Sequence, residues 1–393
     1  MSVNVSSDAF FSDDSKSDFS DNRKIEGDSH ENEVLKARIP NSAPVLSPPR
    51  SDQSSHLPPP GTSSVSSAPF SLVQACVKRI YDLDTVNTAS HKIASHGPDA
   101  NKALLNLYAK MIAAGADRYC VKPSSMPDFL PLYEDLPNFS EVLDEIQRSL
   151  ALCIDSDDPI EIPPLLLVGP PGVGKTHFGQ VIAKMLGTGF HMIPMASTTA
   201  GFVIGGSSSQ WKGSRPGRVF DAFVASQYAN PVFLIDEIDK ASGSRDYDPL
   251  GAFYTLLENG TASKFVDEFA EIEIDTTGAI WIATCNDENS IPSPIRDRMN
   301  VFEVKTPSAE QACRIALLIY REIRKSHAWG ARFPVDLSED VLGAFADVSP
   351  RVVRRAIMTG FGNAKLAHHD EIKVIDLTLK KANKSGPIGF LNS

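Results

Sequence analysis

The feature that most constrains this chain of 393 residues is a short apolar run followed at once by a glycine-rich loop. The run spans residues 165–168, and the next eight residues read Gly169-Pro170-Pro171-Gly172-Val173-Gly174-Lys175-Thr176. This spacing fits G-x-x-x-x-G-K-[ST], in which backbone N–H groups and the lysine bind phosphate oxygens and the hydroxyl binds magnesium. An apolar helical stripe begins at Phe178 and ends before Gly187. Strand, loop and helix together predict a phosphate-binding βαβ unit.

Four more short apolar runs follow, at residues 190–193, 232–235, 279–283 and 301–304. Continuous apolar runs of this length are typical of parallel strands that are covered on both faces. Beyond Pro307 no further strand is expected, because the chain continues with two amphipathic helical stretches, about 309–326 and about 338–366. The order of elements predicts an α/β domain with a five-stranded parallel sheet, followed by a small helical domain.

The composition changes along the chain. The first 70 residues contain 17 serines, 8 prolines and only scattered apolar residues. So little apolar surface cannot offset the entropy lost when a chain is ordered. We therefore expect a disordered tail over 1–70, a helical segment over 71–130, the nucleotide-binding domain over 131–306 and the helical domain over 307–393.

Two amphipathic helices are expected before the first strand of the sheet. In the first, Leu104 and Leu107 belong to an apolar stripe that Gly115 closes. The second is expected to begin near Asn138, with Glu141 as the capping-box partner three residues on.

Charge and cysteine content narrow the class of protein. Thirty-eight basic and 49 acidic residues leave a net charge of -11, which argues against a protein that mainly coats nucleic acid. Residues 162–220 nevertheless contain no Asp or Glu, so the glycine loop lies in a basic sector. The five cysteines are odd in number and widely spaced, and no apolar run reaches the roughly 18 residues of a membrane span. We expect a cytoplasmic protein with reduced thiols and no membrane partner.

Polar side chains follow the later predicted strands. Asp236 and Glu237 come directly after an apolar run, where the first can hold magnesium and the second can polarise an attacking water. Asn286 follows the next run, and its amide can hydrogen-bond to a γ-phosphate or to that water. Two groups of arginines lie further on, and arginines near a phosphoryl group stabilise the charge of its transition state. The groups are Arg296 with Arg298, and Arg351 with Arg354 and Arg355. The pattern indicates nucleotide hydrolysis.

At this set of motifs the sequence resembles the AAA+ ATPases, and most closely the ATPase part of Lon-type proteases. The glycine loop reads GPPGVGKT, residues 213–218 are similar to the family's G-x-x-P-G-R, and residues 230–240 (NPVFLIDEIDK) match its Walker B segment. Residues 291–299 (IPSPIRDRM) are similar to the family's I-P-x-P-L-x-D-R-M. The resemblance covers about 136–366 and implies a P-loop AAA+ core with a helical lid.

Carried over residue by residue, the resemblance implies a site for ATP and Mg²⁺. The loop from Gly169 to Thr176 would hold the phosphates, with Lys175 on their oxygens. Thr176 and Asp236 would hold the magnesium, and Glu237 would complete the Walker B pair.

The resemblance also implies sensor residues and an arginine finger. Asn286 would be sensor 1, and Arg351 would be sensor 2, although SPRVVRR stands here where the family has G-V-R-x-L-E-R. Arg298, in the D-R-M match, would act on the nucleotide of a neighbouring subunit. Arg296 is the alternative for that role.

Two loops match the family's pore loops. Trp211 and Lys212 lie in a glycine- and serine-rich segment and are expected to contact a threaded polypeptide; alternatively, Trp211 packs on its own domain. Residues 265–269 match the second pore loop, although their two phenylalanines are equally expected in the core.

The family's Ser-Lys protease motif is not found after Arg355, so we expect no peptidase activity. The favoured function is Mg²⁺-dependent ATP hydrolysis by a homo-oligomeric ring, expected to be hexameric, that remodels or unfolds protein partners. The expected partner is a protein substrate or adaptor. Two alternatives stay open. One is a nucleic-acid-linked ATPase such as a loader or regulator, and the other is a nucleotide-switched scaffold.

Overall fold

The computed structural model of this chain describes residues 72–97, 101–198, 200–211, 213–241 and 248–379. All of them belong to one compact unit, Ser66–Ser393. The tail expected over 1–70 and the proposed contact residue Lys212 lie outside the described residues.

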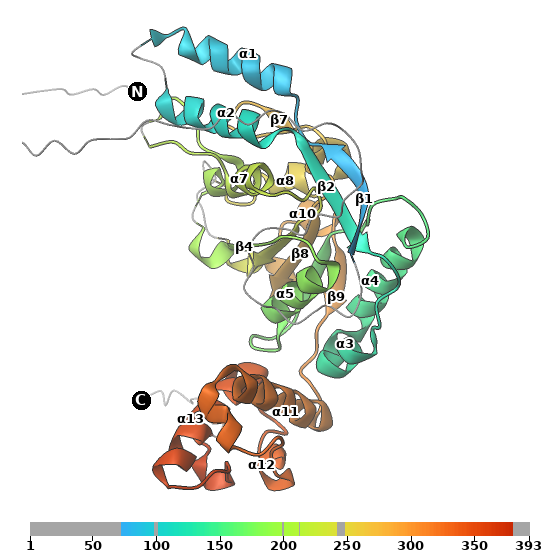
Figure 1. The fold of residues 1–393 in the computed structure, drawn as a ribbon, viewed down its shortest axis with the longest axis vertical. Helices are drawn as coiled ribbons and strands as arrows, with labels where there is room; N and C mark the ends of the chain where they lie inside the picture. The colour runs from blue at the N-terminus through green and yellow to red at the C-terminus, as the bar shows by residue number, and fades with distance from the viewer. Residues whose placement is uncertain (1–71, 98–100, 199, 212, 242–247, 380–393) are drawn as a thin grey trace, which may run out of the picture. The chain divides into compact units, whose positions relative to one another are not determined.

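A five-stranded parallel sheet lies at the centre of the described chain (Figure 1). Its order is β4-β5-β8-β3-β9, and every neighbouring pair is parallel. The strands are β3 (Leu165–Val168), β4 (Phe190–Pro194), β5 (Val232–Asp236), β8 (Ile280–Cys285) and β9 (Asn300–Glu303). Each corresponds to one of the five apolar runs, so the predicted α/β class and parallel sheet are confirmed.

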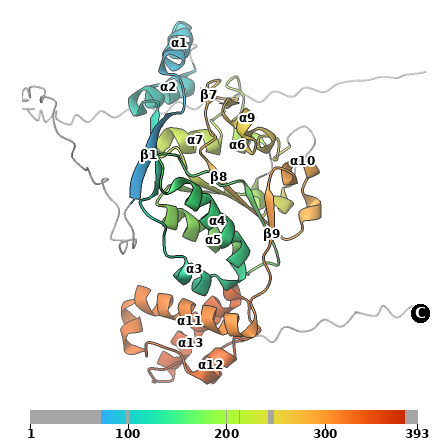
Figure 2. The same ribbon diagram turned by 90° about the vertical axis from the view of Figure 1, so that its right-hand side faces the viewer.

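The two faces of the sheet bury alternate residues of the same strands. Leu165 and Leu167 pack in one cluster with the apolar sides of α4 (Ser140–Cys153) and α5 (Lys175–Leu186), which lie next to each other in Figure 2. Leu166 points to the other cluster, which contains apolar residues of α7 (Arg218–Ala225). Because both faces are covered, each strand reads as a continuous apolar run.

Short elements connect the sheet strands. They are α6 (Phe202–Gly205), α8 (Phe253–Leu256), α9 (Asn259–Ala262), α10 (Ser293–Arg296), β6 (Phe265–Val266) and β7 (Glu273–Ile274), the last two forming an antiparallel pair. A further short helix, α3 (Leu130–Asp135), precedes α4.

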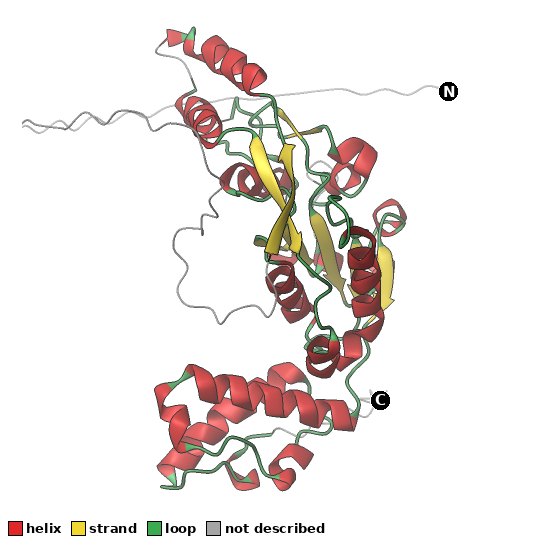
Figure 3. Cartoon of the chain, turned by 45° about the vertical axis from the view of Figure 1, so that its right-hand side comes forward, coloured by secondary structure: helices red, strands yellow, loops and turns green. Residues whose placement is uncertain are grey.

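The described part of the region after Pro307 consists of helices joined by loops and turns, with no strand (Figure 3). It contains α11 (Ala309–Ser326), α12 (Glu339–Gly343) and α13 (Pro350–Leu366) around a separate apolar cluster. Ser308 and Gln311 form a capping box at the start of α11. The single stretch predicted at 338–366 is in fact two helices, because the chain leaves the helix after α12 and Pro350 opens a new one.

The prediction of a helical segment over 71–130 was incomplete. The helices α1 (Leu83–Ala94) and α2 (Lys102–Ala114) are present, but strands β1 (Leu72–Arg79) and β2 (Asp117–Pro123) flank them as an antiparallel pair. β1 is exposed along most of its length, so it lacks the apolar run by which strands were recognised.

Two buried cations fasten β2 to the sheet domain. Arg118 donates to Phe223 O and Val224 O at the end of α7, at 3.1 and 3.0 Å. Lys122 donates to Cys153 O at the end of α4, at 2.6 Å. A positive charge at a helix carboxyl end satisfies carbonyls that have no partner within the helix. The strand β2 is therefore joined directly to α7 and α4.

The predicted capping box at Asn138 was wrong. Pro137–Phe139 form a 3₁₀ turn and α4 begins at Ser140 with no side-chain cap. The Asn138 amide donates instead to Val173 O and Lys305 O, both at 3.3 Å.

None of the helices in the described ranges is long and apolar enough to span a membrane.

Candidate nucleotide-binding site

The sheet order brings the predicted site residues to one edge. β5, β8 and β3 are adjacent, and in a parallel sheet their carboxyl ends meet at the same edge. The glycine loop follows β3, the Asp236–Glu237 pair ends β5, and Asn286 follows β8. Residues separated by more than a hundred positions thus face one another.

The glycine loop depends on its glycines at specific points. A Cβ on Gly169 would stand 2.2 Å from Val304 O, so only glycine fits beside β9. Gly172 and Gly174 have φ angles of 85° and 105°, in the region that side chains rarely adopt. Gly174 precedes the first residue of α5, so the N–H groups at the start of this helix open toward the loop.

Lys175 connects the loop to the end of β8. Its Nζ donates to Gly169 O at 2.5 Å, to Pro170 O at 3.0 Å and to Asn286 Oδ1 at 3.1 Å. Burial lowers the pKa of Lys175, and the charges of nearby acidic groups oppose that shift. The buried ammonium group of Lys175 thus lies between the glycine loop and the end of β8.

Asp236 is held by two hydroxyl groups. Thr176 Oγ1 and Thr284 Oγ1 both donate to Asp236 Oδ1 at 2.9 Å. A hydroxyl and a carboxylate side by side are the hard oxygen donors that Mg²⁺ accepts in nucleotide sites, where it keeps most of its water ligands. The donor set therefore fits magnesium.

Glu237 has an unusual backbone. Its φ and ψ are 55° and 53°, the left-handed region that is uncommon for residues other than glycine. The Glu237 N–H donates to Thr284 Oγ1 at 2.9 Å, which helps to hold this conformation. Thr284 was not singled out from the sequence, although it stands two residues before Asn286 at the end of β8.

Asp239 is a second residue that sequence reasoning missed. Its Oδ2 accepts the N–H of Asn286 at 3.2 Å, so it fixes the backbone of the proposed sensor. The side chain is only 1% exposed, and its Oδ1 has no hydrogen-bond partner among the described residues. Asp239 and Lys240 belong to the segment 230–240 that matched the family's Walker B motif, so the match itself could have singled out Asp239.

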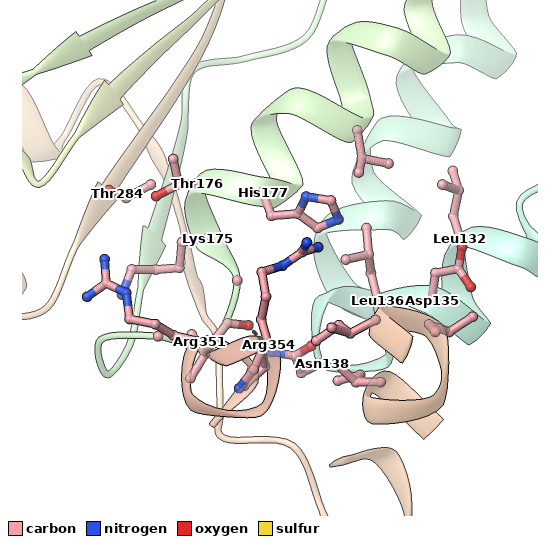
Figure 4. Close-up of a pocket in the computed structure, with 18 of the residues that line it drawn as sticks. Leu132, Asp135, Leu136, Asn138, Lys175, Thr176, His177, Thr284, Arg351 and Arg354 are labelled. Carbon is pink, nitrogen blue, oxygen red and sulfur yellow. Dashed lines mark hydrogen bonds between the residues drawn. The ribbon is translucent and has the colours of Figure 1, made fainter. Parts of the chain in front are cut away.

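A pocket of about 870 Å³ opens beside these groups (Figure 4). Its polar lining includes Lys175, Thr176 and Asn286, and α13 contributes Arg351 and Arg354. Its apolar lining comes from three segments, with Leu132, Leu136, Met185, Ile315 and Ile319. The pocket thus joins an end lined by charged and polar side chains to an end lined by apolar side chains, which suits a ligand with anionic groups and a flat base.

The helical domain approaches the glycine loop directly. A Cβ built on Gly172 would lie 3.4 Å from Ser349 Oγ and 3.6 Å from Arg351 Cβ. Arg354 forms an ion pair with Glu322 of α11. The structure therefore brings Arg351 to the pocket that Lys175 and Asp236 line, together with Arg354, an arginine of the same group to which the resemblance gave no individual role.

Arg298 and Arg296 do not line this pocket. Arg298 donates to Glu258 Oε2 through Nη2 at 2.7 Å and through Nε at 3.1 Å. The Arg298 guanidinium therefore lies at another surface of the same chain and not in the pocket. This position is compatible with a role at the nucleotide site of a neighbouring subunit.

The two predicted pore loops differ. Trp211 is 54% exposed, in a loop whose ends are joined by Ser207 N donating to Arg215 O at 3.2 Å. Phe265 and Phe269 are buried in the core, so they do not present an aromatic surface. Between them, buried Asp267 accepts the N–H of Gly217 at 2.7 Å, which ties the two loops together at their bases.

Comparison with known proteins identifies one domain. Residues 165–306 match the family described as "ATPase family associated with various cellular activities (AAA)". The chain is 32% identical over 222 residues to Lon protease homolog 2, peroxisomal, of Xenopus laevis, covering 49% of this chain and 26% of that protein. It is 36% identical over 155 residues to the Lon protease of Halothermothrix orenii, covering 39% and 20%. The chain thus spans between a fifth and about a quarter of the length of these two relatives.

Among solved structures, the RuvB Holliday junction branch migration motor of Thermotoga maritima matches with a TM-score of 0.43 and 15% identity, over 64% of this chain and 70% of that one. The extended Hsp104:casein complex of S. cerevisiae matches with a TM-score of 0.48 and 13% identity, over 72% and 52%.

Proposed function

Because this chain contains an ATPase domain of the AAA family and is similar over half its length to Lon proteases, we propose that it hydrolyses ATP with Mg²⁺ and uses the energy to remodel protein partners. The observation that carries the proposal is the hydrogen-bonded set at the pocket's polar end. Lys175 bonds to Asn286, and Thr176 and Thr284 bond to the carboxylate of Asp236.

The chain's own groups divide the work of phosphoryl transfer. The loop N–H groups and Lys175 bind the β- and γ-phosphates, which concentrates positive charge where negative charge develops. Thr176 and Asp236 would hold the magnesium, which would neutralise charge on the phosphate oxygens. Glu237 accepts a proton from the attacking water, and Asn286 orients that water or the γ-phosphate.

The helical domain supplies a link between nucleotide and movement. Arg351 lies on α13, yet it lines the same pocket as the glycine loop. A phosphate bound between Arg351 and the glycine loop attracts both of them. Loss of the γ-phosphate therefore weakens the attraction that holds α13 near the loop. Arg298 acts from a neighbouring subunit, and this proposal requires a ring, which we take to be a homo-hexamer.

Trp211 gives the proposed ring its contact with substrate. An exposed indole at the tip of a loop offers a large apolar surface, and a loop carries such a group only at a cost in solvation. We expect Trp211, with Lys212 beside it in sequence, to press against an extended polypeptide.

Two measurements test the proposal. Purified protein should release phosphate from ATP only when Mg²⁺ is present, and EDTA should abolish the release. An unfolded protein should stimulate turnover more than DNA does. Stimulation by DNA alone would favour the nucleic-acid alternative, and turnover too slow to be stimulated by either would favour the nucleotide-switched scaffold.

The contact with substrate is tested separately. Trp211→Ala should retain basal ATP hydrolysis and lose unfolding of a tagged test protein, whereas Trp211→Phe, which keeps an aromatic ring, should retain most of it. Unchanged unfolding by Trp211→Ala would show that the indole only packs on its own domain.

A further inference from the structure

Two thiols outside the candidate nucleotide site face each other across the antiparallel pair of β1 and β2. In the antiparallel register of β1 and β2, Cys76 is the direct partner of Cys120. Directly opposite residues of such strands have Cβ atoms about 4.5–5.5 Å apart, close to the roughly 3.5–4.5 Å of a disulfide. The register shifts between Gln74 and Cys76, so an irregular point of β1 lies beside the pair. The two strands are labelled in Figure 1.

The two thiols have different surroundings. Cys120 is 2% exposed, whereas Cys76 is half-buried. Burial raises the pKa of the Cys120 thiol to about 12, and the next causes are its hydrogen bond with Cys76 and the charge of that group. The Lys78 ammonium acts in the opposite direction on Cys120. Cys76 is therefore the thiol that a dissolved oxidant can reach, and the buried Cys120 is the thiol that reacts second.

We propose that Cys76 and Cys120 form a reversible disulfide when the protein meets a peroxide. The Cys76 thiolate attacks one oxygen of hydrogen peroxide, the O–O bond breaks, and Cys76 becomes a sulfenic acid while the released hydroxide takes a proton to become water. The Cys120 sulfur then attacks the Cys76 sulfur and the S–O bond breaks. The departing hydroxide takes the Cys120 proton as a second water, so two thiols are oxidised and one peroxide is reduced.

The bond would fasten β1 to a strand that is already part of the ATPase domain. Tyr119 N donates to Gln227 O at 2.8 Å, and Val121 N donates to Asn230 Oδ1 at 3.1 Å. These partners lie just before β5, which ends in the Walker B pair. β1 makes its ladder with β2 and is largely exposed, so its separation from β2 is the opening that a disulfide would prevent.

Peptide mass spectrometry tests the proposal directly. Full-length protein is treated with hydrogen peroxide, its remaining thiols are alkylated, and its peptides are compared before and after reduction with dithiothreitol. We expect one peptide pair linked through Cys76 and Cys120, reversed by dithiothreitol, and a melting temperature several degrees higher in the oxidised protein. Cys313→Ser removes another half-buried cysteine and should leave both results unchanged.

Single variants separate the two thiols. Cys76→Ser should leave Cys120 reduced and abolish the rise in melting temperature. Cys120→Ala should leave Cys76 as a sulfenic acid that dimedone traps. The proposal would be overturned if wild-type protein kept Cys120 reduced while Cys76 was singly oxidised, or if Cys76 formed links only between chains. Because the wild-type protein gives the primary result, a variant that fails to fold does not weaken the test.

Discussion

At the scale of single residues, the proposed active site depends on side chains that position the groups which touch the nucleotide. Thr284 donates to Asp236 and accepts from the backbone of Glu237. Asp239 accepts from the backbone of Asn286. Thr284 thus holds both residues of the proposed Walker B pair, and Asp239 holds the backbone of Asn286. Loss of either side chain is expected to change the rate of hydrolysis more than nucleotide affinity.

Thr284→Val keeps the size of the side chain and removes its hydroxyl. We expect kcat for ATP hydrolysis to fall about 10- to 100-fold with little change in nucleotide affinity, because Lys175 and the loop still bind phosphate. Steady-state kinetics and nucleotide titration measure the two quantities.

Thr276→Val is the matched control for this change. Thr276 is also fully buried, and its hydroxyl donates to Ala262 O at 2.9 Å away from the pocket. It should keep kcat within about twofold of wild type. Equal losses in both variants would mean that the effect of Thr284→Val is structural.

The single-residue motifs could be predicted from sequence because they are local. The glycine loop and Asp236–Glu237 each follow an apolar run directly, and parallel strands bring such positions to one edge. Thr284, Asp239 and Arg354 carry no comparable pattern. Their place follows from pairing between distant segments, which one sequence does not display.

At the scale of elements, strands with continuous apolar runs were recognisable, whereas β1 was not. Its side chains are mostly exposed, and its stability comes from pairing with β2. The start of α4 shows a related limit, since Asn138 has the right type and spacing for a cap but bonds to Val173 and Lys305 instead. Local sequence patterns indicate which conformations and hydrogen bonds a segment can form, and tertiary contacts determine which of these the folded protein contains.

Asp267 joins two of these elements. It accepts the N–H groups of Gly217, Phe269 and Ala270 at 2.7, 3.0 and 3.0 Å, and it is fully buried. Burial raises the pKa of its carboxyl from 3.8 to about 6, against the effect of these hydrogen bonds. A raised pKa means that the folded state binds the proton more tightly than the unfolded state does. The stability linked to this group is therefore fully present below about pH 4 and is lost as the pH rises through about 6.

This linkage is measurable with Asp267→Asn, which cannot titrate. We expect the free energy of unfolding of wild type, relative to that variant, to be larger at pH 5 than at pH 7 by about 1 kcal/mol. Urea unfolding of both proteins at the two pH values gives the difference. A difference that does not change with pH, or that grows toward pH 7, would show that the Asp267 pKa is not raised.

At the scale of the whole molecule, the proposed site residues divide between the pocket and another surface of the chain. Walker residues, sensor and Arg351 come together in the pocket, while Arg298 pairs with Glu258 outside it. If Arg298 acts on a neighbour, two inactive variants should complement each other. Lys175→Ala lacks a functional loop but keeps Arg298, and Arg298→Ala has the opposite defect.

Mixing the two variants tests this arrangement. Each alone should be nearly inactive, and an equal mixture assembled together should recover about a quarter of wild-type turnover, because one site in four then has both an intact loop and an intact neighbour. Arg296→Ala mixed with Lys175→Ala serves as the comparison for the alternative finger. No recovery with either arginine variant would exclude action in trans.

The claim on which the rest depends is that Glu237 activates the water that cleaves ATP. Glu237→Gln keeps the side chain's shape and removes its ability to accept a proton. With saturating Mg²⁺ and ATP, we expect the turnover number to fall at least about 100-fold while nucleotide affinity stays within a few-fold of wild type. Turnover that survives this substitution at close to the wild-type rate would contradict the proposed mechanism.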